Sequence, residues 1–150
     1  MSVLAFPVAD VIARLAAKVP LAKTVGAAAD LQAVLKTPPS VKVALYVLAF
    51  DRGGEIKYSG PNVSVQNVNT QLQVVLLVRH SAGERVGAGA RKLADDVIAQ
   101  VRGALVGWAP ADAFEAISFR AGRDDNYLAG WYAGQQVFDT AFRIHNEVLP

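Results

Sequence analysis

Residues 41–50 are the segment that most restricts the fold of this chain. They read Val-Lys-Val-Ala-Leu-Tyr-Val-Leu-Ala-Phe and are apolar on both faces of an extended chain. A strand of that kind has to be covered on both sides, and its residue types favour strands. The segment therefore predicts a central strand. Asp51-Arg52-Gly53-Gly54 is the predicted turn after it, and residues 55–61 are expected to form a short ribbon or a projecting loop.

Residues 63–80 predict a second, longer strand. Its first half is polar and includes Gln66, Asn69 and Gln71, whereas its second half, Val74–Val78, is apolar. We expect such a strand to extend beyond the core of its own domain. An unpaired strand edge offers a row of hydrogen-bonding groups, so this arm is a natural contact between subunits.

Helical spacing of apolar residues appears in residues 8–19, 27–36 and 90–105. Pro20, the pair Pro38-Pro39 and the segment Gly107-Trp108-Ala109-Pro110 follow these three stretches. Proline cannot continue a helix, and glycine often ends one, so we expect three helices with these boundaries.

Three strands are predicted after the last helix. They cover Phe114 to Arg120, Tyr127 to Tyr132 and Gln135 to His145, with a turn at residues 122–126 and Gly134 between the last two strands. The chain of 150 residues corresponds to one domain, residues 1–150. The prediction is an α+β fold with a mostly antiparallel sheet flanked by helices, in the order helix, helix, strand, strand, helix, then strands.

The composition restricts the function. The 15 basic and 13 acidic residues give a net charge of only +2, without the basic cluster that nucleic-acid binding needs. The chain has no cysteine, and its longest apolar run, Val43 to Phe50, is too short to span a membrane. The N-terminus lacks the features of a secretion signal. Hydrophobic residues make up 53% of the chain, so we expect part of the apolar surface to be buried against other subunits.

No residue pattern indicates catalysis, a metal or a cofactor. His80 and His145 lie at predicted strand ends without ligands at metal-binding spacing. The glycine-rich stretch from Gly83 to Lys92 lacks the lysine of a phosphate-binding loop, because Ala90 occupies its place. We therefore expect no enzymatic activity and no cofactor.

The charged turn and the aromatic residues that follow it have two interpretations each. Arg120, Arg123 and Asp124 form either a solvated turn or a polar contact at the rim of a subunit interface. Tyr127 and Trp131 belong either to the core or to an interface, where Tyr and Trp often contribute most of the binding energy.

Four parts of the sequence together resemble a known family. They are the strand ending Gln71-Leu72-Gln73-Val74-Val75-Leu76-Leu77-Val78-Arg79, the helix Lys92 to Leu105, the Gly107-Trp108 pair with Pro110, and the strand segments Phe114-Glu115 and Phe138 to Phe142. Over residues 8–145 this layout resembles the tail terminator proteins of Mu-like phages and prophages. The resemblance is a pattern of elements and of aliphatic and aromatic positions.

The resemblance implies an α+β fold and a hexameric ring that caps the tail tube, stops its polymerisation and offers a surface to the head connector. It implies no cofactor and no enzymatic activity. The implied partners are further copies of the chain, the tail tube protein and the head–tail connector or neck protein, with DNA only passing through the lumen and no membrane. The implied location is the virion, assembled in the cytoplasm of the bacterial host.

The family has no short motif that fixes contact residues, so the candidates come from the loop 51–62, the strand arm, the turn 120–126 and the aromatic residues that follow this turn. The candidate contacts with another subunit or the tube are Arg52, Glu55, Lys57, Tyr58, Gln66, Asn69, Gln71, Arg120, Arg123, Asp124, Tyr127 and Trp131. Another tail-completion or head–tail joining protein is the first alternative. A small-ligand-binding or enzymatic α+β domain and a nucleic-acid-binding domain are the others.

Overall fold

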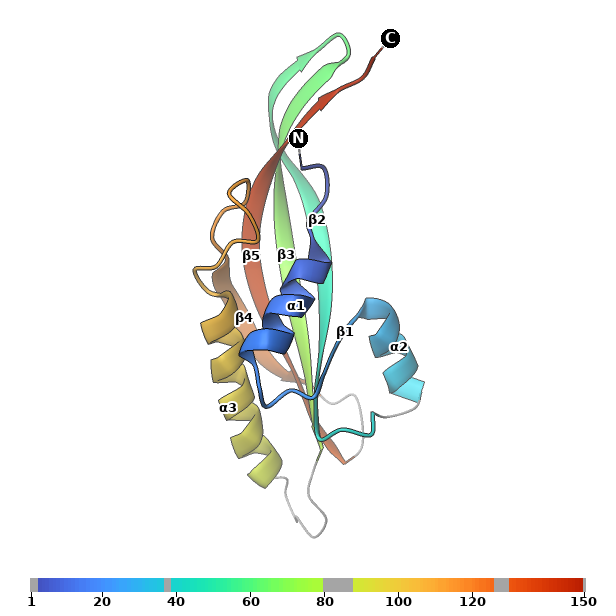
Figure 1. The fold of residues 1–150 in the computed structure, drawn as a ribbon, viewed down its shortest axis with the longest axis vertical. Helices are drawn as coiled ribbons and strands as arrows, with labels where there is room; N and C mark the ends of the chain where they lie inside the picture. Colours follow the sequence, from blue (N-terminus) through green and yellow to red (C-terminus); the bar gives the residue numbers. More distant parts are fainter. Residues whose placement is uncertain (1–2, 37–38, 80–87, 126–129, 150) are drawn as a thin grey trace.

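The computed structural model describes residues 3–36, 39–79, 88–125 and 130–149. The elements in chain order are α1 (Val8–Lys18), β1 (Thr24–Ala27), α2 (Ala28–Lys36), β2 (Val43–Gly60), β3 (Val63–Arg79), α3 (Ala88–Leu105), β4 (Ser118–Asp125) and β5 (Trp131–Glu147). The described strands form one sheet in the order β1-β2-β3-β5-β4, in which only β1 and β2 are parallel (Figure 1). The predicted α+β class, with a mostly antiparallel sheet and three helices, is confirmed.

The alternation of side chains along the strands divides the core between the two faces of the sheet. Val43, Leu45 and Val47 of β2 pack on the face covered by α1 and α3, in the larger cluster. Ala44 and Tyr46 point to the opposite face, where α2 covers them. Residues 43–47 are buried on both faces because helices lie on both sides. The predicted central strand is thereby confirmed.

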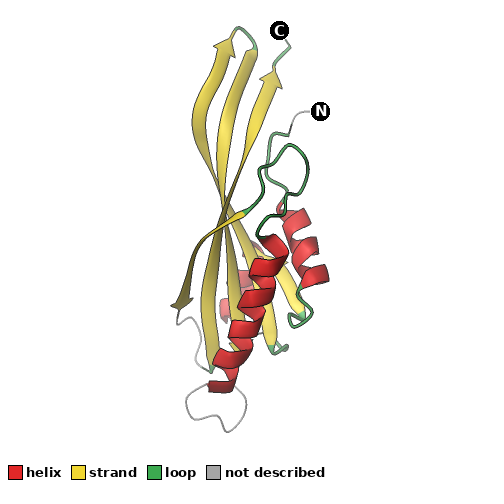
Figure 2. Ribbon diagram, turned by 90° about the vertical axis from the view of Figure 1, so that its left-hand side faces the viewer, coloured by secondary structure: helices red, strands yellow, loops and turns green. Residues whose placement is uncertain are grey.

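The sheet continues past the helices as a narrow ribbon of β2, β3 and β5 (Figures 1 and 2). We call it the arm, and it consists of residues 54–60 of β2, 63–67 of β3 and 143–147 of β5. The strands β3 and β5 pair without a register shift along their whole length, which keeps the arm continuous with the core. As predicted, the strand at residues 63–79 extends beyond the core.

Two details of the predicted arm are wrong. The strand β3 has no unpaired edge, because it lies in the middle of the sheet between β2 and β5. Residues 51–54 form no turn, because β2 runs through them. Its register with β3 shifts twice just beyond, between Gly53 and Ile56 and between Ile56 and Tyr58. The chain instead reverses at Pro61-Asn62, where Asn62 has a φ of 61°.

The C-terminal strands also differ from the prediction. Residues 122–125 belong to β4 and not to a turn, and β4 starts only at Ser118. The strand β5 continues through Gly134, so the described residues after α3 hold two strands instead of three. Gly134 is needed for close packing, because a Cβ there would lie 3.0 Å from the carbonyl oxygen of Arg123 and closer still to the Tyr132 hydroxyl. The short strand β1 was not predicted.

Candidate assembly interface

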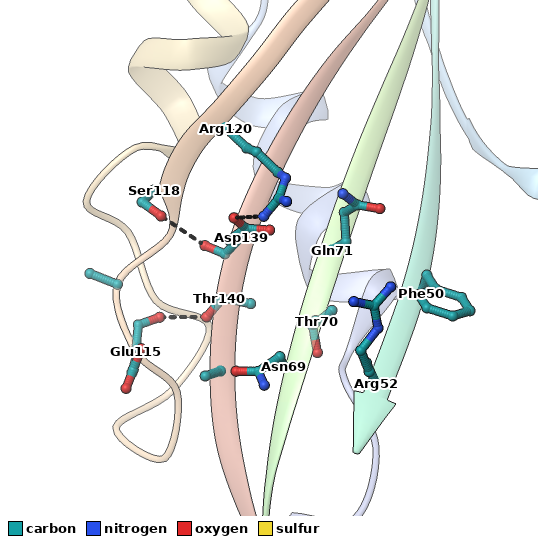
Figure 3. A pocket seen from close by; sticks show the side chains of 12 residues that line it. Phe50, Arg52, Asn69, Thr70, Gln71, Glu115, Ser118, Arg120, Asp139 and Thr140 are labelled. Carbon is teal, nitrogen blue, oxygen red and sulfur yellow. Dashed lines mark hydrogen bonds and ion pairs between the residues drawn. The ribbon is translucent and has the colours of Figure 1, made fainter. Parts of the chain in front are cut away.

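An open groove lies at the base of the arm, on the face of the sheet that also carries α2. Its volume is about 360 Å³. The side chains that define it are Phe50, Arg52, Asn69, Gln71, Arg120 and Asp139 (Figure 3). The strand register explains this gathering, because Phe50 pairs with Gln71, which in turn pairs with Asp139 on β5.

The two arginines of the groove have different surroundings. The Arg120 guanidinium binds the Asp139 carboxylate at 2.9 Å, and this pair connects β4 to β5. Arg52 stacks over the ring of Phe50, with 5.8 Å between the guanidinium carbon and the ring centroid. Phe50 itself is 58% exposed. The groove thus combines a bound ion pair, a cation and an exposed aromatic ring, which suits contact with another molecule better than catalysis.

Polar contacts fix the sheet beneath the groove. The Thr140 hydroxyl donates to the carbonyl oxygen of Glu115 at 2.7 Å, and this bond attaches the segment before β4 to β5 (Figure 3). On β3, the Thr70 hydroxyl donates to the Asp51 carboxylate at 2.6 Å. Both threonines are buried near the boundary between the core and the arm. The two hydrogen bonds therefore give each buried hydroxyl group a partner.

The arm carries four of the predicted contact residues. Glu55 and Lys57 form an exposed ion pair at 2.7 Å, and the hydrogen bond and charge of Lys57 lower the pKa of Glu55. The Gln66 amide donates to the carbonyl oxygen of Gly54 at 3.2 Å, across the irregular part of β2. Tyr58 is exposed, as is Ile56, which the prediction did not include. The arm therefore presents apolar side chains to solvent.

The remaining predicted residues lie away from the groove. Asp124 accepts a hydrogen bond from the Tyr132 hydroxyl at 2.6 Å and forms an ion pair with Arg91 of α3. Arg123 forms an ion pair with Asp125 at 3.3 Å. Trp131 is partly buried and packs against the cluster beneath α2. Tyr127 lies outside the described residues.

The groove brings together Arg52, Asn69, Gln71 and Arg120 from three strands, and it adds Phe50 and Asp139, which sequence reasoning missed. The sequence held a weak signal for Phe50, which ends an apolar run immediately before charged residues. Only the strand register could have identified Asp139.

Neither a metal-ligand cluster nor a membrane-spanning helix is found in the part of the chain that the structure describes. Its His, Asp and Glu side chains form no cluster of three that could hold a metal ion. Among the described helices, none combines the length and apolar character needed to cross a membrane. His145 is exposed on the arm, and His80 lies outside the described ranges.

Comparison with known proteins gives one family. A family model described as phage tail terminator protein matches residues 1–148. A search of curated proteins gives no match. The matched range includes the residues of both the groove and the arm.

Proposed function

This chain belongs to the phage tail terminator family, and from that premise we propose that it forms a hexameric ring that caps the tail tube. Membership makes it a structural protein of the phage tail and hence a component of the virion. The cap stops polymerisation of the tube protein and offers a surface to the head–tail connector. Assembly takes place in the cytoplasm of the bacterial host.

The arm is the observation that carries the proposal of an assembled ring. The accessible surface of the chain is 8541 Å², whereas a compact monomer of its mass exposes about 7,300 Å². None of the helices that the structure describes covers either face of this three-stranded ribbon, so the ribbon has a large surface for its mass. A surface of this kind is typical of subunits that bury a projecting element against a neighbour.

The distribution of exposed apolar side chains also favours a ring. One group lies along β2, at Phe50, Ile56 and Tyr58. A second group, Val106 and Phe119, lies beyond α3 and on β4, the opposite edge of the sheet. Two different patches on opposite sides of a subunit allow head-to-tail contacts, which close into a ring when the rotation between subunits permits it.

The near-neutral charge agrees with DNA that passes through the lumen without tight binding. The net charge is +2, and three of the arginines on β4 and α3 are held in ion pairs, namely Arg91, Arg120 and Arg123. Binding through DNA phosphates requires several cations free to displace counterions. DNA is thus cargo in this proposal, and the binding partners are the tube protein and the connector.

The test is the tail length in phage particles made without this gene. We expect tubes of irregular, excessive length that fail to join heads, measured by negative-stain electron microscopy. Supplying the gene from a plasmid is the control and should restore the narrow length distribution. Tails of normal length would overturn the terminator function, and if such tails lie unjoined beside full heads, they would indicate a tail-completion or head–tail joining protein.

A further inference from the structure

The cation in the groove lacks an acidic partner within the subunit. Arg52 contacts the ring of Phe50, and no carboxylate among the described residues forms an ion pair with it. The neighbouring Arg120, in contrast, is neutralised by Asp139. The groove therefore offers one uncompensated positive charge beside one exposed aromatic face, which is complementary to a carboxylate followed by apolar side chains.

The tip of the arm carries a segment with that chemistry. Glu147 is the last residue of β5 and is exposed, without an ion pair in the described structure. Val148 and Leu149 follow it, and Leu149 is 90% exposed. The backbone amide of Val148 donates to the carbonyl oxygen of Asn62 at 2.7 Å, which holds this segment at the arm tip.

A subunit cannot place this segment in its own groove. Arg52 pairs with Asn69, and Asn69 pairs with Ala141 of β5, so the groove and Glu147 are separated by six residues of one continuous strand. At a rise of about 3.3 Å per residue, that separation is about 20 Å. Leu149 is only two residues beyond Glu147, so it reaches about 7 Å further. Any docking must therefore occur between two molecules.

We propose that residues 147–149 of one copy dock into the groove of a second copy, with Glu147 bound to Arg52 and the Leu149 side chain against Phe50. The inference rests on the proposed ring and names the contact that connects its subunits. A contact between arm tip and groove is heterologous, because the two surfaces are different, and repetition of it around an axis closes a ring.

Cross-linking tests the contact directly, since the chain contains no cysteine. Two separately tagged variants, Phe50→Cys and Leu149→Cys, are expressed together to complement a phage that lacks the gene. Tails are purified and treated with a short bismaleimide. We expect a species of twice the subunit mass that carries both tags. The matched control pairs Leu149→Cys with Asp96→Cys, at an exposed residue of α3 on the face of the sheet opposite the groove, and should give no mixed species.

Charge exchange provides a second test. Arg52 and Glu147 are both exposed, so reversing their charges should leave the fold of the subunit intact. Arg52→Glu in the Phe50→Cys chain should lower the cross-linked fraction about tenfold, because like charges then face each other. Glu147→Arg in the Leu149→Cys chain should have the same effect. Combining the two reversed chains should restore most of the cross-linking.

The outcomes separate this contact from the proposed function. Tails of normal length that contain both cysteine variants, without the mixed species, overturn the docking and leave the terminator function intact. Cross-linking of Phe50→Cys to the tube protein or the connector also overturns it, because the occupant is then not a second copy. Failure of the terminator function appears separately, as normal tail length in phage without the gene.

Discussion

The hydroxyl of Tyr132 on β5 donates a hydrogen bond to the carboxylate of Asp124 on β4, with 2.6 Å between the oxygens. Arg91 of α3 binds the same carboxylate and lies over the Tyr132 ring, 5.4 Å from its centroid. The helix is thereby attached to the edge of the sheet through one acidic side chain.

These contacts predict how stability depends on pH. The hydrogen bond from Tyr132 and then that from Arg91 lower the pKa of Asp124, so the stabilisation is present at neutral pH and is lost as the pH falls through the folded-state pKa. We expect Asp124→Asn to cost about 0.5–1 kcal/mol at pH 7, a modest value because the side chain is exposed. Urea unfolding should show this loss at pH 7, and the loss should shrink as the pH falls below the ordinary Asp value of 3.8. Asp96→Asn, on the exposed side of α3, is the control.

The phenol group of Tyr132 should make the stability of the fold depend on pH under alkaline conditions. Burial, followed by the hydrogen bond to Asp124, raises the pKa of Tyr132 above its ordinary value of 10.0. The unfolded state therefore loses its phenolic proton first, and stability declines as the pH rises above that value. Tyr132→Phe should remove this part of the decline. Equal slopes of unfolding free energy against pH, for wild type and variant above pH ~10, would contradict the assignment.

Two phenylalanines should differ sharply in their effect on stability. Phe138 is fully buried and packs edge-on against Phe119, with 6.0 Å between the ring centroids. We expect Phe138→Ala to lower the free energy of unfolding by about 3–5 kcal/mol through the cavity it creates. Phe50→Ala should change it by less than about 0.5 kcal/mol, because that ring is mostly exposed. Chemical denaturation of both variants measures the difference, and similar losses would contradict the placement of Phe50 at the surface.

Two glycines of the α3 region should respond to alanine with opposite signs. Gly107 lies in the turn two residues after the end of α3 and has a φ of 86°, which a residue with a Cβ adopts at a cost. Gly107→Ala should therefore destabilise the protein by about 1 kcal/mol. Gly103 lies inside α3 with open space where a Cβ would point, so Gly103→Ala should stabilise it by about 0.5–1 kcal/mol. Thermal unfolding distinguishes the two, and a shift of the same sign for both would refute this interpretation.

Loss of the buried Gln136 amide should reduce the stability of the fold more than loss of an amide in the groove. Its oxygen accepts a hydrogen bond from Arg102 at 2.8 Å, and its nitrogen donates to the carbonyl oxygen of Gln135 at 3.0 Å. Gln136→Ala should cost about 1–2 kcal/mol, because it removes both bonds and leaves a void. Gln71→Ala, at a partly exposed position, is the matched control and should be nearly neutral. Equal midpoints of denaturation would show that the Arg102 contact contributes nothing.

Much of the fold could be predicted from local patterns. Helical spacing of apolar residues identified α1, α2 and α3, and the two-sided apolar run identified β2. The polar first half of β3 indicated that the sheet extends beyond its helices. The two wrongly predicted turns share a cause. Local sequence around Gly53-Gly54 and Gly122 is typical of turns, but these glycines lie in strands that neighbouring strands hold extended.

The amino-acid sequence by itself determined the class of the fold, the helices and the resemblance to tail terminators, because periodicity and helix-ending residues act over a few positions of the chain. Only the tertiary structure decided that Arg52, Arg120 and Asp139 share one groove, because the register of β2, β3, β4 and β5 brings together residues far apart in sequence. It also placed β3 in the centre of the arm. Strand pairing is non-local, because the register between two strands depends on which side chains the whole sheet buries and not on residues adjacent in the chain.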